Sequence, residues 1–185
     1  IIAKEKYHVS FEAETPEKQP DSLTFHFGKD KGDEWVSESD IVHDFALAHP
    51  DCSFALGNAV LEYLDEKQHS ERNIPELKAG WYKKTDFSIT AVIDGEEFNY
   101  DGRFDIGDGK GTGGGSLIDH IRTYNEGILG YTQHPFNQPE YKERAQRMLD
   151  IFVPFLEAHS ELTAEEQRIF DDFKAQHPIR TYDDV

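Results

Sequence analysis

Hydrophobic and polar residues alternate along two segments near the start of the chain. Tyr7, Val9 and Phe11 stand between polar neighbours, and the same period of two returns from Leu23 to Phe27. Successive side chains of a strand point to opposite faces of a sheet, so this alternation is typical of half-buried strands. We expect two strands here, joined by a connection that contains Pro, Gln and Asp.

A β-hairpin over residues 80–106 is the clearest local prediction. Its turn falls at Asp94-Gly95, a residue pair that tolerates the positive φ angles of a two-residue turn. Pairing Ile93 with Glu96 then fixes the register of the two arms. Their apolar side chains gather on one face, in the pairs Ala91 with Phe98, Ile89 with Tyr100 and Phe87 with Gly102.

Helices are predicted on both sides of this hairpin, where apolar residues recur with helical spacing. Ser37-Glu-Ser-Asp40 resembles a capping box in front of a short helix that stops at His49-Pro50. Ser53 and Ser116 are placed to cap two further helices, which stop near residues 71 and 130.

The last third of the chain predicts two more helices and a tail. Pro139 suits the first turn of a long amphipathic helix, which Pro154 should bend or end early. A capping box at 163–166 opens the final helix, which ends before His177-Pro178. The tail over residues 179–185 is expected to fray.

Together these elements predict an α+β fold, with an antiparallel sheet of about four strands, helices packed on one face and a C-terminal helical hairpin. With 185 residues and 37% apolar composition, the chain can bury a sizeable core. We expect a single domain over residues 1–185, with sheet and helices in 1–130, the helical hairpin in 138–176 and the tail in 177–185.

The chain is strongly acidic, with 37 Asp and Glu against 19 Lys and Arg and a formal net charge of −18. Because phosphates would be repelled, we expect no direct binding to nucleic acid. The acids are spread along the whole chain, which favours an ordinary solvated surface. Mimicry of DNA is the alternative that this charge also permits.

The only cysteine, Cys52, excludes an internal disulfide and cannot by itself hold a structural zinc, as is typical of a reducing compartment. No basic and then apolar leader opens the sequence, and no apolar run is long enough to cross a bilayer. We expect a cytoplasmic protein without membrane contact. Because the sequence begins at Ile1 rather than Met, we also expect a piece excised from a longer protein.

The glycine-rich segment from Asp105 to Ser116 leads into a predicted helix, where free N–H groups and the helix dipole could bind an anion. It fits neither the P-loop pattern nor the dinucleotide-binding pattern. A mobile connector is the simpler interpretation, so we expect no cofactor. The candidate binding residues are Gly107, Gly109, Lys110, Gly111, Gly113, Gly114, Ser116 and His120.

Carboxylates near this segment suggest a hard cation instead. Asp101, Asp105 and Asp108 could offer oxygen ligands to Ca²⁺ or Mg²⁺, although their spacing is not that of an EF-hand. The nine histidines form no zinc-binding pattern. The best local candidates for metal binding or catalysis are the pairs His43 with Asp44, His49 with Cys52, and Asp119 with His120.

Two further candidates have simpler structural explanations. Cys52 lies in front of an apolar helix, which favours a buried, inert thiol over a nucleophile. Trp35, Trp81 and Tyr82 could form a stacking platform, but no basic groove accompanies them, so core packing is favoured.

Several segments, read together, resemble the large polyvalent protein-associated domains. They are Asp21–Gly28, Phe54–Asp65, Gly80–Phe87, Tyr100–Gly109 and Pro135–Tyr141. The resemblance implies an α+β accessory module of a very long protein from a conjugative element or phage. Such modules accompany helicase, methylase, primase or peptidase domains, and the resemblance brings no catalytic motif to these positions.

We therefore expect a non-enzymatic accessory module that binds a protein partner or positions neighbouring domains of a longer parent protein. The alternative is an acidic DNA mimic that inhibits a restriction or repair enzyme. A third hypothesis is a nucleotide- or metal-binding enzyme domain that uses the glycine-rich segment.

Overall fold

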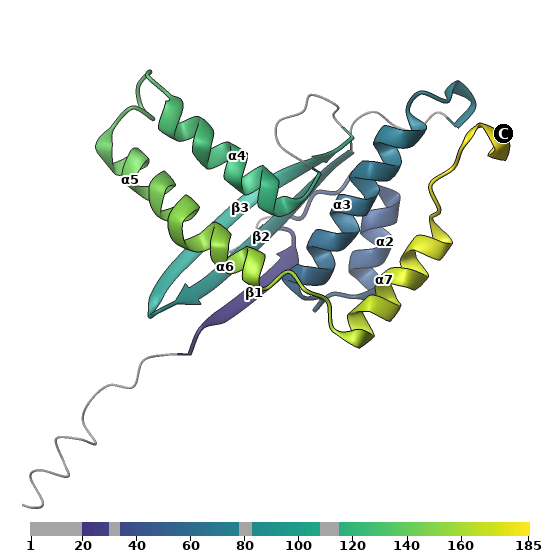
Figure 1. Cartoon of the computed structure of the whole chain (residues 1–185), viewed down its shortest axis with the longest axis horizontal. Coiled ribbons are helices and arrows are strands. Elements are labelled where there is room, and N and C mark those ends of the chain that lie inside the picture. Colours follow the sequence, from purple (N-terminus) through teal and green to yellow (C-terminus); the bar gives the residue numbers. More distant parts are fainter. Residues whose placement is uncertain (1–19, 30–33, 78–82, 108–114) are drawn as a thin grey trace, which may run out of the picture.

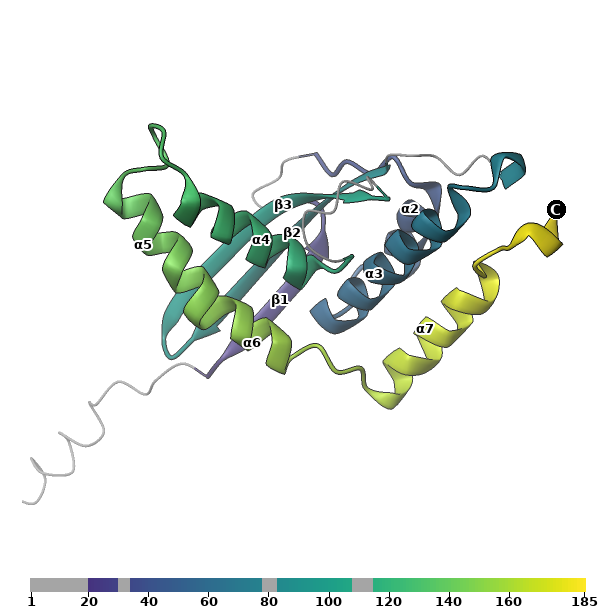
Figure 2. The ribbon, with the colours of Figure 1, turned by 45° about the horizontal axis from the view of Figure 1, so that its top comes forward.

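The computed structural model describes residues 20–29, 34–77, 83–107 and 115–185, and its α+β architecture confirms the predicted fold class. Helices α4, α5 and α6 lie in front of the sheet, and α3 and α7 lie side by side next to them (Figure 1, Figure 2). The strands are β1 (Ser22–Phe27), β2 (Lys83–Ile93) and β3 (Glu96–Ile106). The helices are α2 (Asp40–Ala48), α3 (Phe54–Glu71), α4 (Leu117–Gly130), α5 (Pro139–Arg147), α6 (Val153–Ala158) and α7 (Ala164–Gln176).

The hairpin of β2 and β3 has the predicted register. Ile93 pairs with Glu96, and each further predicted pair down to Phe87 with Gly102 is present. Asp94 and Gly95 turn the chain with φ angles of 51° and 81°, the left-handed values that a two-residue hairpin turn requires. This register aims one face of the hairpin at the helices, where Phe87, Ile89 and Ala91 are buried.

The described sheet has three antiparallel strands in the order β1-β2-β3, not the expected four. The predicted strand over residues 6–12 lies outside the described residues. Beyond β1, the edge of β2 is continued by a short bridge between Ser37 and Thr85. There the Asp86 N–H donates to the carbonyl of Val36 over 2.8 Å, so backbone groups left open by the end of β1 are satisfied.

Serine residues cap the helices that flank the hairpin, with one correction. The Ser53 and Ser116 side chains accept hydrogen bonds from the backbone N–H groups of Leu56 and Asp119, as predicted. The cap of α2 is Ser39 rather than Ser37. Ser37 instead forms the bridge to Thr85. Only the residue directly before the first turn of a helix can cap that helix, and for α2 this residue is Ser39.

The helix that contains Pro154 neither ends early nor continues as a regular α-helix. Between α5 and α6, residues Met148–Phe152 form a π-helical turn, named η2. There the Val153 N–H donates to the carbonyl of Met148, five residues back. Pro154, which has no N–H to donate, falls in the first turn of α6, where helices tolerate proline.

The two predicted C-terminal helical arms are present, and each packs on a different helix. α5 and α6 lie along α4, whereas α7 lies along α3. The ring of Phe173 on α7 contacts Phe45 on α2 and Tyr63 on α3 at centroid distances of 5.4 and 6.1 Å. The predicted capping box of α7 is formed at both of its hydrogen bonds, between Thr163 and Glu166.

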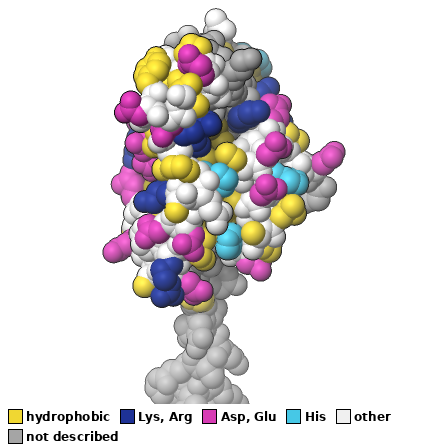
Figure 3. Space-filling model, turned by 90° about the vertical axis from the view of Figure 1, so that its right-hand side faces the viewer, with side chains coloured by type: hydrophobic (Ala, Val, Ile, Leu, Met, Phe, Trp, Pro, Cys, Tyr) yellow, Lys and Arg dark blue, Asp and Glu magenta, His cyan; other side chains and the backbone are white. Residues whose placement is uncertain are grey.

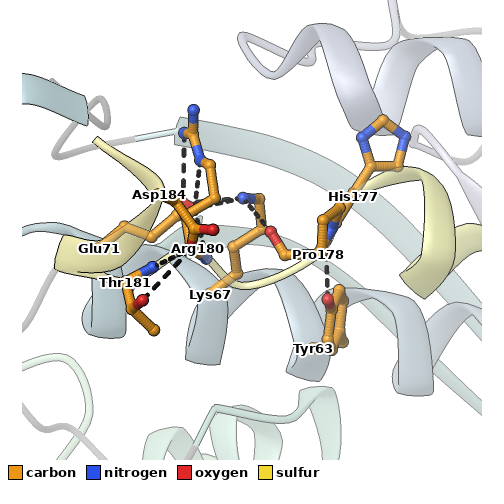
Figure 4. A network of polar contacts seen from close by, with 8 residues as sticks. All are labelled: Tyr63, Lys67, Glu71, His177, Pro178, Arg180, Thr181 and Asp184. Carbon is orange, nitrogen blue, oxygen red and sulfur yellow. Dashed lines mark hydrogen bonds and ion pairs between the residues drawn. The ribbon is translucent and has the colours of Figure 1, made fainter.

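The C-terminal tail is docked on α3, so the expectation that it frays is wrong. The Tyr63 hydroxyl donates to the carbonyl of His177 over 2.7 Å, and Lys67 Nζ donates to that of Pro178 over 2.9 Å (Figure 4). Arg180 Nε donates to Glu71 Oε1 over 2.9 Å. These three helix residues are spaced by four, so they form one stripe along α3 that holds the tail.

Candidate functional site

The carboxylate of Asp65 lies close to both described ends of the glycine-rich segment and binds one of them. The Gly107 N–H donates to Asp65 Oδ1 over 2.7 Å. A Cβ atom on Gly115 would lie 2.5 Å from Asp65 Oδ2, so a side chain there would collide with the same group. The Gly107 N–H is therefore already bonded to a carboxylate, and the negative charge of Asp65 would repel an anion that approached it.

The remaining residues of the predicted anion site are placed as follows. Ser116 caps α4, and the Leu117 N–H behind it donates to the buried Asn58 side chain over 2.8 Å. Gly109, Lys110, Gly111, Gly113 and Gly114 lie outside the described residues. Asp65 and Asn58 were missed by the sequence analysis, although a polar Asn58 within the apolar positions 54–64 is a signal of such a role.

The predicted cation ligands Asp101 and Asp105 lie on the same face of β3. Four residues of strand separate them by about 13 Å, and Arg103 lies between them, with its Nε 3.0 Å from Asp86 Oδ1. Asp108 lies outside the described residues. In the part of the chain that the structure describes, no group of three or more His, Cys, Asp or Glu side chains is arranged to hold a metal ion.

Cys52 is buried, and burial raises the pKa of its thiol to about 12, with further contributions from Glu166 and Asp51. The thiol is therefore protonated at neutral pH, which does not suit a nucleophile. Trp35 stacks on the ring of His43 at a centroid distance of 5.0 Å, which is a packing role. Trp81 and Tyr82 lie outside the described residues.

His120 is the predicted binding residue that the structure brings to a cavity. An open groove of about 370 Å³ runs along one side of α4 and the segment that follows it. We name it the aromatic groove, and its lining consists of His120, Thr123, Tyr124, Gly127, Ile128, Tyr131 and Phe136. The first five of these residues recur with helical spacing on one face of α4, and Tyr131 and Phe136 follow the end of that helix.

Two groups of aromatic rings flank the aromatic groove. Tyr100 on β3 contacts His120 and Tyr124 edge-on, at centroid distances of 6.2 and 6.0 Å. On the other side, Phe136 contacts Tyr131 and Tyr141 at 5.5 and 5.4 Å. Burial, and then the nearby Tyr124, raise the pKa of the Tyr100 phenol above its ordinary value, so the Tyr100 side chain is uncharged at neutral pH.

Large aromatic side chains remain exposed at this groove. Tyr124 and Tyr131 keep 50% and 46% of their surface exposed, and both are among the few large hydrophobic side chains that do so. Exposed apolar surface of this kind, gathered at a hollow, is typical of an interaction site.

Gly127 leaves the floor of the aromatic groove open. A Cβ atom built there would meet nothing within 4 Å. Glycine in a helix costs about 1 kcal/mol relative to alanine, and no contact within the described fold requires it. A larger residue at this position would stabilise α4, but it would occupy space that Gly127 leaves free.

Lys142 fixes the far end of the groove. Its Nζ donates to the carbonyl of Leu129 over 3.0 Å and also to those of Ile128 and Tyr131. An ammonium group at the C-terminal end of a helix is favoured by the helix dipole. These contacts fasten α5 to the end of α4 and so hold Tyr131 in place.

The sequence analysis singled out only His120 among the lining residues and did not identify the aromatic groove. The signal it overlooked is the helical spacing of His120, Tyr124, Gly127 and Ile128, which puts a glycine next to aromatic residues on one face.

Comparison with known protein families shows which family the chain is related to. Residues 34–137, more than half of the chain, match the family described as large polyvalent protein associated domain 25. The chain belongs to this family. The match to the polyvalent protein associated domain includes α2, α3, the hairpin, α4 and the whole lining of the aromatic groove, and it ends before α5. No curated protein and no solved structure matches the chain.

None of the helices in the described ranges combines the length and the apolar character needed to cross a bilayer.

Proposed function

We propose that the chain is a non-enzymatic accessory domain that binds a protein segment in the aromatic groove. The segment belongs to a partner protein or to a neighbouring domain of a longer parent protein encoded by a mobile element. The single observation that carries this proposal is the open floor at Gly127 between the half-exposed rings of Tyr124 and Tyr131. Membership of a family of polyvalent protein associated domains supports an accessory role.

The chemistry of the groove suits a protein ligand. Tyrosine offers a large, rigid apolar face with a polar tip, so it can contact a partner at little entropic cost and still tolerate water. The volume is near the lower end of ligand sites, which begin at about 300 Å³. It fits one or two anchoring side chains of a segment that otherwise lies on the surface. We place this function in the cytoplasm, where the free thiol of Cys52 stays reduced.

The test uses a peptide library displayed on phage and selected on the immobilised domain. Gly127→Leu should fill the groove without a clash in the fold, and the selected peptides should bind it at least tenfold more weakly. Leu47→Ala is the matched control, since Leu47 is 67% exposed on α2 and should leave binding unchanged. Selected peptides that bind Gly127→Leu as tightly as the original domain would contradict the proposal.

An acidic DNA mimic is the second candidate, and one observation favours it. Burial raises the pKa of Glu62, and the neighbouring carboxylates of Asp119, Glu66 and Asp65 raise it further, so negative charge gathers between α3 and α4. On the face seen in Figure 3, however, Asp and Glu side chains are interspersed with Lys, Arg and His. Mimicry predicts that Glu62→Gln together with Glu66→Gln weakens binding to a DNA-binding enzyme, whereas Gly127→Leu does not.

A further inference from the structure

We infer that the side chain which enters the aromatic groove is cationic, an arginine or lysine of the bound segment seated between Tyr124 and Tyr131. This inference rests on the proposed function and specifies its ligand. Three observations carry it: the chemistry of the rings, the charge around them, and the way the chain binds its own cations nearby.

The walls of the groove are aromatic rings rather than aliphatic side chains. The face of such a ring attracts a guanidinium or ammonium group within about 6 Å of its centroid. Tyr124 and Tyr131 are about half exposed, so a cation from outside can reach their faces. The aliphatic stem of arginine or lysine would meanwhile cover Ile128 and the open floor at Gly127.

The negative charge of the chain favours a cationic ligand, although Lys142 and Arg144 bring positive charge to the end of the groove beside Tyr131 and Tyr141. The whole chain has a net charge of −18, which raises the local concentration of cationic ligands. On α4, Asp119 and the exposed Glu126 lie one turn before and one turn after Thr123 of the lining. The basic residue between them, Arg122, bonds to both Asp119 and Glu157, so this group of three side chains keeps a net negative charge.

Two cationic side chains of the protein itself, Arg144 and Lys142, are bound beside the groove. The guanidinium of Arg144 lies 5.3 Å from the ring centroid of Tyr141, which is the outer ring of the group that includes Phe136 and Tyr131. Lys142 meets the carbonyls at the end of α4. A surface of the first kind, a tyrosine face, also borders the open part of the groove at Tyr124 and Tyr131.

The experiment titrates the full chain, labelled with ¹⁵N, with two peptides at physiological salt. One is acetyl-Gly-Ser-Arg-Ser-Gly-amide, and the other carries norleucine, an uncharged straight chain, in place of arginine. The arginine peptide should shift the backbone signals of residues 123–131 and should bind about 3- to 30-fold more tightly than the norleucine peptide. Tyr131→Leu keeps apolar bulk but removes the ring face, so it should abolish this preference. Gly127→Leu should abolish the shifts themselves.

Each other outcome has a definite meaning. Equal binding of both peptides, blocked by Gly127→Leu, would overturn the cationic ligand and leave the proposed function standing. Shifts spread over the acidic surface and unchanged by Tyr131→Leu would also overturn the cationic inference. If neither peptide perturbs residues 123–131, the cationic inference fails. If library-selected peptides also ignore Gly127→Leu, the proposed function fails with it.

Discussion

Two glycines in helices have opposite roles in this protein. A Cβ atom on Gly57 of α3 would lie 2.2 Å from the buried ring of Phe25, so β1 can approach α3 only because that position has no side chain. Gly127 of α4 has no such neighbour. The first glycine is required by packing, whereas the second faces open space.

Replacing each of these glycines by alanine should change stability in opposite directions. Gly127→Ala should raise the free energy of unfolding by about 0.5–1 kcal/mol, because alanine restricts the unfolded chain and favours the helix. Gly57→Ala should lower it by about 1–3 kcal/mol, since Phe25 must move. Urea denaturation followed by circular dichroism measures both, and a loss of stability in Gly127→Ala would show that its space is needed by the fold.

The thiol of Cys52 should react slowly in the folded protein. Its pKa is raised from 9.0 to about 12, so the thiolate fraction at neutral pH falls about a thousandfold relative to an exposed cysteine. Reaction with a chromogenic disulfide reagent should be slow in buffer and fast in urea. Equal rates in the two conditions would mean that the thiol is accessible in the fold.

At the scale of elements, the docked tail depends on a buried carboxylate. The side chain of Glu71 is only 2% exposed and binds both Lys67 and Arg180. Burial acts to raise the pKa of Glu71, but hydrogen bonds from Arg180 and Lys67 outweigh it, so the pKa lies below the ordinary 4.5. A buried charge is stable only with such partners, and this requirement links α3 to the tail.

The tail should therefore detach in acid. Because the folded pKa of Glu71 is lowered, its contribution is fully present above about pH 4.5 and is lost as the pH falls through the folded value. Heteronuclear NOE values for residues 178–185 should drop over this range. Glu71→Gln should show a loosened tail already at pH 7, whereas Glu66→Gln, at an exposed position of the same helix, should behave as the original chain. A tail that remains rigid in Glu71→Gln would contradict this account.

At the scale of the whole molecule, the core extends beyond the region that matches the family. That region covers residues 34–137, yet Phe25 of β1 packs on Phe54 at a centroid distance of 6.1 Å. Beyond its other end, Phe152 stacks on Phe98 at 5.9 Å. Residues on both sides thus bury the same sheet and helices, which favours one cooperative unit.

Phe173→Ala tests whether α7 belongs to that unit. Removing this buried ring should cost about 3–5 kcal/mol, because it loses contact with Phe45 and Tyr63. In a single domain, tryptophan fluorescence and circular dichroism should shift together to lower urea concentrations. A shift in circular dichroism alone would show that α7 unfolds separately. Leu47→Ala, at an exposed position, should change the free energy of unfolding by less than about 0.5 kcal/mol.

Local interactions made much of the fold predictable from the sequence. The turn at Asp94-Gly95, the caps at Ser53, Ser116 and Thr163, and the helix end before His177 depend on residues within a few positions of one another. The expectation for Ser37 failed because a bridge to Thr85, 48 residues away, competes for it. The docking of the tail also depends on such distant partners.

The sequence by itself determined the strand and helix positions, the hairpin register and the acidic surface, because these follow from periodicity, turn residues and composition. Only the tertiary structure decided that Asp65 binds Gly107 and lies close to Gly115, that Glu71 holds the tail, and that an open groove lies beside Tyr124 and Tyr131. A groove or a buried ion pair arises where elements distant in the sequence meet, so its geometry is set by packing and not by the order of residues in any one segment.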